Sequence, residues 1–259
     1  MPSPPGRALA RGWFAAASDE VAPALLNKIL AVRREDGWRW VRIVEVEAYA
    51  WHDPASHSYG GVRPRNAVMY GAPGHLYVYF SYGMHWCANI VTGPVGSGQA
   101  VLLRAGEPLG GVEAMTAARR SSARDLCRGP ARLAQALGLD RSDNGRGLTA
   151  GTRRPVGAVL VLDDGVPPPQ PPAVGPRVGI TRAADVPWRW WVPGSPWVSP
   201  FRPGGRNAGA GGPGGRNAGR PGGVRAVGPS RRWEPGSAFG GHPTTSRAIS
   251  GTAAGGGMI

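Results

Sequence analysis

The composition of the chain changes after residue 200, and this change limits what the chain can fold into. Residues 1–200 carry mixed, periodic sequence, whereas Gly, Pro, Arg and Ala dominate residues 201–259, where PGGRNAG occurs at 203–209 and again at 213–219. A segment this poor in apolar side chains cannot bury enough surface to offset the entropy of ordering it. We therefore expect a folded domain over 1–200 and a disordered Gly/Pro/Arg-rich tail over 201–259.

Charge indicates the kind of partner. The net charge is +14, Lys28 is the only lysine, and the tail holds eight arginines and a single acid, Glu234. A chain this basic favours a polyanion as partner, and an Arg/Gly-rich tail can hold nucleic acid loosely. Two other interpretations stay open. The arginine bias can reflect a GC-rich genome, and the tail can be a dispensable extension or a shifted reading frame.

Cysteine and hydropathy patterns indicate the compartment. Two cysteines, Cys87 and Cys127, cannot build a disulfide framework or a four-cysteine zinc site. The apolar run WFAAAS is too short for the core of a signal peptide, and no run approaches the roughly 18 apolar residues of a spanning helix. We expect a cytoplasmic, nucleoid-associated protein with no membrane partner.

The periodicity of apolar residues favours a mixed fold. It predicts helices over 19–32, 110–120 and 128–139, strands over 38–50, 99–108, 156–164 and 176–183, and a hairpin over 75–91. Strands and helices do not alternate regularly, as they would in a doubly wound sheet. An α+β fold with an antiparallel sheet is therefore expected.

Two carboxylates share one face of the strand over 38–50. With strict alternation, one face carries Val44, Val46 and Ala48, and the other carries Ile43, Glu45, Glu47 and Tyr49. Such a face can simply be exposed. It can also supply the two acids of a glycoside hydrolase, although those acids lie on opposite sides of the bond that is cut. Residues two apart lie side by side, so one general base with a structural neighbour fits better.

Aromatic residues gather on the predicted hairpin. Tyr77 and Tyr79 share one face of its first strand, and Tyr82 falls at its tip beside Gly83. A position in the core suits Phe80 and Tyr77, but a large ring at a turn is usually exposed. An exposed ring on a hairpin beside arginines is typical of a nucleic-acid surface and can act as a wedge between base pairs.

Four other polar residues have simpler interpretations of their own. Arg104 ends an apolar run, so its guanidinium can reach inward to a carboxylate or stay at the surface. Asn89 follows the hairpin turn and can be only an edge residue. His85 and Cys87 alternate on a strand, but no third and fourth ligand stands nearby, so we expect no metal site.

Six blocks in order resemble one known family. They are VEVEAYAWHDPASHSYGG, PRNAVMYGAPGHLYVYFSYGMHWCANIV, AVLLRAGEPLGGVEAM, DLCRGPARLAQALGL, PRVGIT and WVPGSPWVS, between about residues 8 and 199. Together they are similar to the alkyladenine (3-methyladenine) DNA glycosylase family in its bacterial form. The resemblance implies one mixed domain with a curved antiparallel sheet, surrounding helices and a protruding β-hairpin. It also implies excision of alkylated and deaminated purines from double-stranded DNA, without a metal or cofactor.

The resemblance also implies residue roles. Glu47 matches the carboxylate that activates water, whereas Glu45 matches a position with no assigned chemical role. Arg104 and the backbone of Val178 match groups that hold the water. The remaining matches are a base-binding pocket of Tyr49, His57, Tyr79 and Asn89, an intercalating Tyr82 flanked by Met84 and His85, and a basic rim contact at Arg65. Asn89 matches the residue that excludes guanine.

The implied mechanism is base flipping followed by hydrolysis. A base inside the duplex must be extruded at a cost of a few kcal/mol, and Tyr82 would fill the gap. Tyr49 and Tyr79 would favour a cationic methylated purine. Lyase activity needs an amine nucleophile, and Lys28 lies outside the blocks, so we expect a monomeric, monofunctional glycosylase.

Departures and rivals remain. The loop SYGGVRPRN looks shorter than in animal members of the family, so its contacts with the DNA backbone stay open, and the tail has no counterpart in the family. A non-catalytic nucleic-acid-binding protein and a carbohydrate hydrolase are the alternative functions. Release of a base from methylated DNA would separate them from a glycosylase.

Overall fold

The longest strand, β3 (Gly37–Tyr49), lies in the interior of an antiparallel sheet, between β2 and β6. The computed structural model describes residues 2–204 apart from 82, 120–121 and 149–153. Within these residues the sheet has nine strands, with the main order β1-β7-β2-β3-β6-β5-β4. Strand β9 also pairs with β3, and β8 pairs with β9, so the end of β3 has neighbours on more than one side.

The remaining elements are short. The strands are β1 (Arg7–Ala8), β2 (Ile29–Arg34), β4 (Leu76–Ser81), β5 (His85–Thr92), β6 (Gln99–Gly110), β7 (Val159–Asp163), β8 (Ala173–Gly175) and β9 (Arg189–Trp191). The helices are α1 (Ser18–Leu25), α2 (Val112–Arg119) and α3 (Pro130–Leu137), with 3₁₀ turns at Arg11–Phe14, Ala67–Tyr70, Ala123–Asp125 and Arg141–Asp143.

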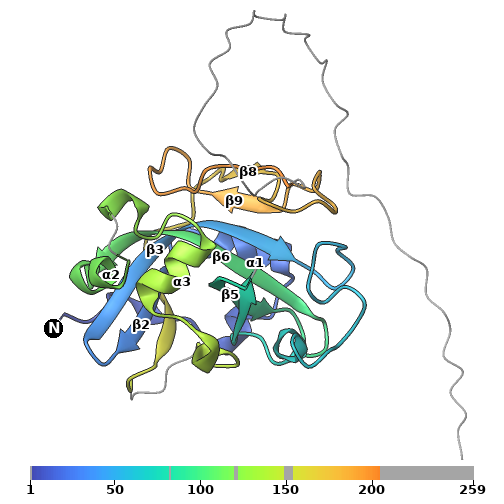
Figure 1. Cartoon of the computed structure of the whole chain (residues 1–259). Helices are drawn as coiled ribbons and strands as arrows, with labels where there is room; N and C mark the ends of the chain where they lie inside the picture. Colours follow the sequence, from blue (N-terminus) through green and yellow to red (C-terminus); the bar gives the residue numbers. More distant parts are fainter. Residues whose placement is uncertain (1, 82, 120–121, 149–153, 205–259) are drawn as a thin grey trace, which may run out of the picture. The chain divides into compact units, whose positions relative to one another are not determined.

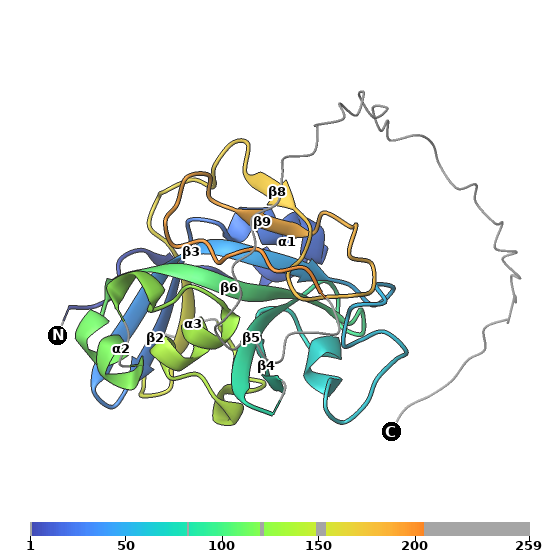
Figure 2. The same cartoon turned by 45° about the horizontal axis from the view of Figure 1, so that its top comes forward.

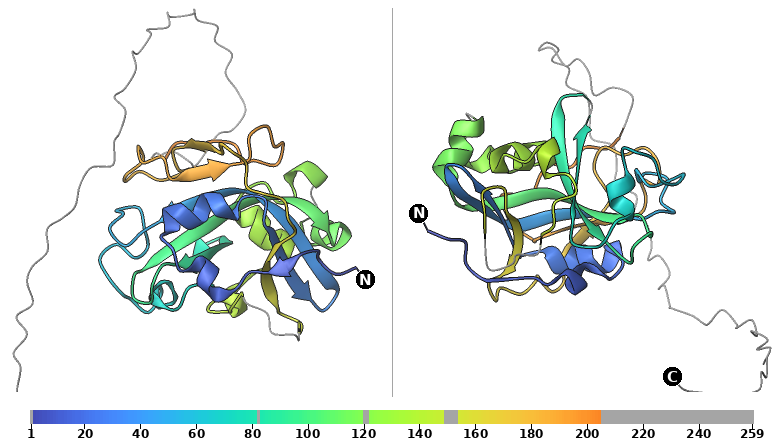
Figure 3. Two further views of the ribbon diagram at one scale, coloured as in Figure 1. Left: turned by 180° about the vertical axis from the view of Figure 1, so that it is seen from behind. Right: turned by 90° about the horizontal axis from the view of Figure 1, so that it is seen from below.

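Helices cover the sheet from different sides. Helices α2 and α3 face the viewer in Figure 1, whereas α1 is nearest in the view from behind in Figure 3. The strands β8 and β9 lie along β3 (Figure 2), and the β4–β5 hairpin extends away from the sheet in the right-hand view of Figure 3. No helix in the described part of the chain has the length and apolar character needed to cross a membrane.

One main apolar core holds these layers together. It joins Leu25 of α1, Val46 of β3, Leu103 of β6 and Leu137 of α3, all of which are buried. Burying one such side chain contributes about 1.5–3 kcal/mol relative to leaving it exposed. The strands that carry the polar residues described below are therefore fixed from behind by close packing.

Most predicted elements are confirmed. The mixed α+β class with an antiparallel sheet is correct, as are the hairpin, the strands over β6 and β7, and the helices α2 and α3. Two predictions are wrong. The helix expected over 19–32 ends at Leu25, because Asn27 takes a left-handed φ of 66° and the following residues pair with β3 as β2. The strand expected over 176–183 is irregular chain after β8.

The strict alternation expected along β3 is also wrong. The pairing of β3 with β6 shifts register between Ile43 and Glu45 and again between Glu45 and Val46. Such a bulge reverses which side chains share a face. Ile43 therefore packs in the same core cluster as Val46 and Ala48, instead of lying beside the carboxylates.

Candidate active site

A cavity of about 970 Å³ opens beside the C-terminal end of β3. Strands β3, β4, β5 and β6 and the irregular chain around Val178 form its walls. Eight of the predicted site residues line this cavity: Glu47, Tyr49, His57, Arg65, Tyr79, Asn89, Arg104 and Val178. The cavity therefore combines one carboxylate with aromatic rings.

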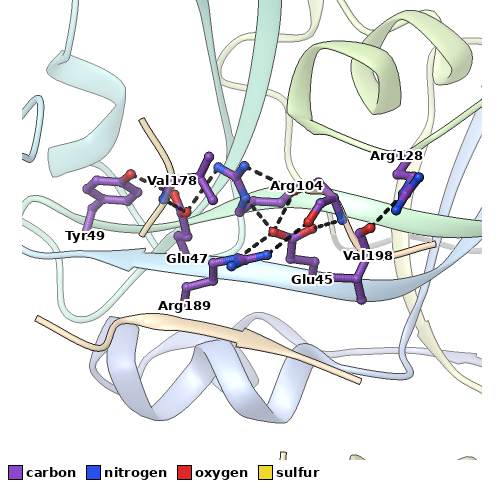
Figure 4. A network of polar contacts seen from close by, with 9 residues as sticks. Glu45, Glu47, Tyr49, Arg104, Arg128, Val178, Arg189 and Val198 are labelled. Carbon is purple, nitrogen blue, oxygen red and sulfur yellow. Dashed lines mark hydrogen bonds and ion pairs between the residues drawn. The ribbon is translucent and has the colours of Figure 1, made fainter. Parts of the chain in front are cut away.

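Glu47 is completely buried at this wall and is held by three partners (Figure 4). The backbone N–H of Val178 donates to Oε1 at 2.7 Å, and the Tyr49 hydroxyl donates to Oε2 at 2.9 Å. The Arg104 guanidinium forms an ion pair with Oε1 at 3.1 Å. A carboxylate has about four acceptor sites, so Glu47 keeps capacity to accept from a further donor in the cavity.

Glu45, two residues earlier, does not line the cavity. Its carboxylate accepts from Arg104 Nε at 2.9 Å, Arg189 Nε at 2.7 Å, and Ser199 through N at 2.7 Å and Oγ at 2.9 Å. The two acids therefore differ in their surroundings: Glu47 lies at the cavity wall, whereas Glu45 is enclosed by guanidinium and serine donors away from the cavity.

The charges around Glu45 and Arg104 shift the pKa values of both groups. Burial alone would raise the pKa of Glu45, but the guanidinium groups of Arg104 and Arg189 outweigh it and hold that pKa below its usual value. Burial alone would lower the pKa of Arg104, but the carboxylates of Glu47 and Glu45 outweigh it and raise that pKa. Figure 4 shows Arg104 between the two carboxylates, which it bridges.

Aromatic rings form the other walls of the cavity. The rings of Tyr77 and Tyr79 stack with centroids 5.6 Å apart, and His57 meets Tyr79 edge-on at 4.4 Å. The Nδ1 atom of His57 and the Tyr77 hydroxyl are hydrogen-bonded at 3.0 Å. Burial, with help from Arg65, lowers the pKa of His57, so its ring is neutral at pH 7.

Burial also fixes the protonation of the tyrosines. Together with the neighbouring Glu47 it raises the pKa of Tyr49 well above its usual value, and it raises the pKa of Tyr77 to about 12. Burial, followed by the contact with Cys87, raises the pKa of Tyr79 well above its usual value. At neutral pH all three remain phenols, so Tyr49 is a hydrogen-bond donor to Glu47.

Asn89 is fixed in the wall by the hairpin. It pairs with Tyr77 across β4 and β5, and its Nδ2 donates to the Tyr77 carbonyl at 3.0 Å. The side chain is buried and lines the cavity. The orientation of the amide is therefore set by a backbone group and not by solvent.

The predicted DNA contacts are spread more widely. Arg65 is exposed and lines the cavity. Met84, 66% exposed, and His85 lie near the end of the hairpin, and Tyr82 lies outside the described residues. The core position considered for Phe80 is wrong: Phe80 is 50% exposed and its ring lies 4.7 Å from that of Trp86, because it is on the opposite face of β4 from Tyr79.

Sequence reasoning missed the partners that come from distant segments. These are Asp53, Arg177, Arg189, Ser199 and Arg202. Arg177 had a weak signal, because it directly precedes Val178. Ser199 had only its place at the end of the WVPGSPWVS block, and Arg202, which lies beyond the change in composition, had no signal. Across the described residues, no group of three His, Cys, Asp or Glu side chains could hold a metal ion.

The α+β fold and the aromatic cavity with its buried carboxylate agree with one class of protein, the DNA glycosylases. The sequence profile of one family, described as methylpurine-DNA glycosylase (MPG), matches residues 12–196. The chain belongs to this family.

Individual relatives agree with the family. A protein of Burkholderia orbicola is 55% identical over 202 residues, which cover 77% of this chain and 94% of the relative. A protein of Rhodopseudomonas palustris is 49% identical over 202 residues, 76% of this chain and 93% of the relative. A protein of Streptomyces avermitilis is 48% identical over 200 residues, 75% of this chain and 92% of the relative. The names of all three propose 3-methyladenine DNA glycosylase activity.

Proposed function

We propose that this protein flips alkylated purines, and also deaminated purines, out of double-stranded DNA and hydrolyses their N-glycosidic bonds. The observation that carries the proposal is the Glu47 carboxylate, held by three partners at the wall of an aromatic cavity. Family membership supports DNA with methylated purines as the substrate. Bacterial DNA lies in the cytoplasm, which would be the working compartment.

In this mechanism Glu47 is the general base. Water entering the cavity donates a hydrogen bond to the carboxylate, attacks C1′ of the sugar and transfers its proton to Glu47 as the base departs. Methylation at N3 or N7 makes the purine cationic and therefore a good leaving group. The products are a free base and an abasic site.

The walls would favour a cationic base. Tyr49 and Tyr79 offer electron-rich faces, and each contact with a cation contributes roughly 0.5–2 kcal/mol. His57 is neutral at pH 7, so it does not repel that cation. The only lysine, Lys28, pairs with Asp163 at 2.8 Å and is not part of the cavity wall, which agrees with a glycosylase that forms no Schiff base.

Base release from duplexes with one defined lesion tests the function. We expect the protein to release 3-methyladenine and hypoxanthine and to leave an abasic strand that is cut only after alkali treatment. A fluorescent base placed next to the lesion should brighten as the lesion is extruded. Tight lesion binding without any released base would instead support the rival, a non-catalytic nucleic-acid-binding protein.

Replacing Asn89 should change which purines are excluded from the cavity and therefore not excised. Guanine carries a 2-amino group that adenine and hypoxanthine lack, and the fixed amide of Asn89 would clash with it. We expect Asn89→Ala and Asn89→Ser to raise excision of guanine lesions relative to 3-methyladenine, measured in single turnovers on matched duplexes. If all rates fell in proportion, Asn89 would only support the hairpin.

Two truncations should distinguish the contribution of the tail to DNA binding from the contribution of residues 201–204 to excision. Arg202 lines the cavity, and its carbonyl accepts from the Gly179 N–H at 3.0 Å, next to Val178. Deleting residues 205–259 should leave single-turnover excision unchanged while flattening the salt dependence of non-specific DNA binding, since most arginines of the tail are lost. Deleting 201–259 should also lower excision, about 10-fold, because the segment behind Val178 loosens. Equal excision rates for the two truncated chains would contradict the expectation that residues 201–204 support the site and residues 205–259 do not.

A further inference from the structure

Arg177 is a buried cation with no part in the chemistry proposed above. Its side chain is 1% exposed, among the largest fully buried groups of the described chain. The guanidinium donates to both carboxylate oxygens of Asp53, to the Ala48 carbonyl at 3.0 Å and to the Ala183 carbonyl at 3.3 Å. Asp53 is itself buried. Burying an ion pair costs free energy of desolvation, so its geometry needs a reason beyond stability.

The position of Arg177 relates it to Glu47 along two routes. The first is the chain itself: the next residue, Val178, supplies the N–H that lies 2.7 Å from Glu47 Oε1. A guanidinium fixed by Asp53 and two carbonyls leaves the adjoining peptide little freedom to move. The first route therefore fixes one hydrogen-bond donor on Glu47.

The second route runs through an aromatic ring. The Arg177 guanidinium lies over two rings, 4.7 Å from the centroid of Tyr49 and 5.5 Å from that of Trp188. Planar guanidinium groups stack on such rings, which lysine cannot do. The Tyr49 hydroxyl donates to Glu47 Oε2 at 2.9 Å. Arg177 also binds the carbonyl of Ala48, the residue that joins Glu47 to Tyr49 in the chain.

Both hydrogen bonds to Glu47 thus come from groups that Arg177 holds. We propose that Asp53 and Arg177 act as a positioning pair, which aligns the Val178 N–H and the Tyr49 hydroxyl on the two oxygens of the general base. The inference deepens the proposed function and rests on it. Neither residue touches the substrate, so the pair would affect the rate of bond cleavage more than the affinity for the lesion.

The test compares excision with binding in point variants of the full chain. In Arg177→Met and in Asp53→Asn we expect single-turnover excision of 3-methyladenine at saturating enzyme to fall about 10–100-fold, as expected for misalignment by about 1 Å. The dissociation constant for the same duplex, measured on a non-cleavable analogue, should change less than about threefold. Arg177→Lys keeps the charge but not the stacking plane, so it should restore only part of the rate.

A second ion pair provides the matched control. Arg42 binds Asp164 with two hydrogen bonds of 3.2 and 2.7 Å and donates to the Asn27 carbonyl at 2.8 Å, outside the cavity wall. Arg42→Met and Asp164→Asn should lower the melting temperature and leave the excision rate of the folded protein unchanged. If these controls lost excision as strongly as the Asp53 and Arg177 variants, the effect would be general destabilisation and the proposal would be wrong.

Other outcomes are equally decisive. Wild-type excision in folded Arg177→Met, or binding that weakens as much as the rate falls, overturns the positioning pair. If Arg177→Met does not fold at the assay temperature, Asp53→Asn decides, because it retains the guanidinium and its bonds to Ala48 and Ala183. If the wild-type protein releases no base, the proposed function itself is wrong. If the wild type releases base and the Asp53 and Arg177 variants release it at the same rate, only the proposed positioning role of this pair is wrong.

Discussion

Glu47→Gln should abolish base excision while leaving lesion binding almost intact. The amide has the shape of the carboxylate, and its oxygen can still accept from the Val178 N–H. The Tyr49 hydroxyl can turn from donor to acceptor toward the amide nitrogen. What the amide cannot do is take a proton from water. Loss of a general base costs about 10²–10⁴-fold in rate, which makes this the largest catalytic effect we expect.

The measurement is single-turnover release of 3-methyladenine, with binding to a lesion duplex measured in parallel. Glu113→Gln is the matched control, since it makes the same chemical change in the first turn of α2. It should excise at the wild-type rate. A Glu47→Gln protein that binds the lesion and still releases base within about tenfold of the wild-type rate would remove Glu47 from the role of general base.

Glu45→Gln should produce the largest loss of stability and a smaller loss of catalysis. It removes the negative charge that neutralises two buried guanidinium groups, Arg104 and Arg189. Removing one partner of a buried ion pair costs about 3–5 kcal/mol. We therefore expect a clear fall in the melting temperature, with excision by the folded fraction reduced less than in Glu47→Gln. Equal losses of excision would mean that the two carboxylates share one role.

The loss should depend on pH in a defined direction. The pKa of Glu45 is lowered in the folded protein from an ordinary value of 4.5, so its stabilising effect is complete above about that pH and disappears as the pH falls through the lower, folded value. The difference in unfolding free energy between wild type and Glu45→Gln should therefore be constant at neutral pH and shrink below pH 4.5. A double variant, Glu45→Gln with Arg189→Met, restores the charge balance and should recover part of the stability. If the difference in unfolding free energy between wild type and Glu45→Gln increased at acidic pH, the ion-pair explanation would be wrong.

The sequence predicts the secondary structure of this protein better than the side-chain contacts within its site. Periodicity and turn residues are local signals, so the hairpin, β6 and α3 follow from them directly. The separate roles of Glu45 and Glu47 do not. Both lie on one strand with similar neighbours in sequence, and they differ in the donors around each carboxylate and in that only Glu47 lines the cavity.

The donors from Val178, Arg189 and Ser199 could not be predicted from periodicity, because they reach the strand from far along the chain. Arg177 lies within the segment 176–183 that is predicted as a strand, yet its backbone is irregular, and its side chain contacts Ala48 and Asp53. Irregular chain has no periodicity from which its position in space could be inferred. The family resemblance indicated Val178, but it gave no reason for the buried pair behind it.

The contact between Glu45 and Ser199 spans 154 residues of sequence. On the ribosome the chain grows from its N-terminus, so β3 is made long before the segment that completes it. Until Ser199 and Arg202 have been added, Glu45 lacks two of its four hydrogen bonds and the wall around Val178 lacks its support. A nascent polypeptide can therefore assemble the sheet, but not a finished catalytic centre, before the last residues of the folded region emerge.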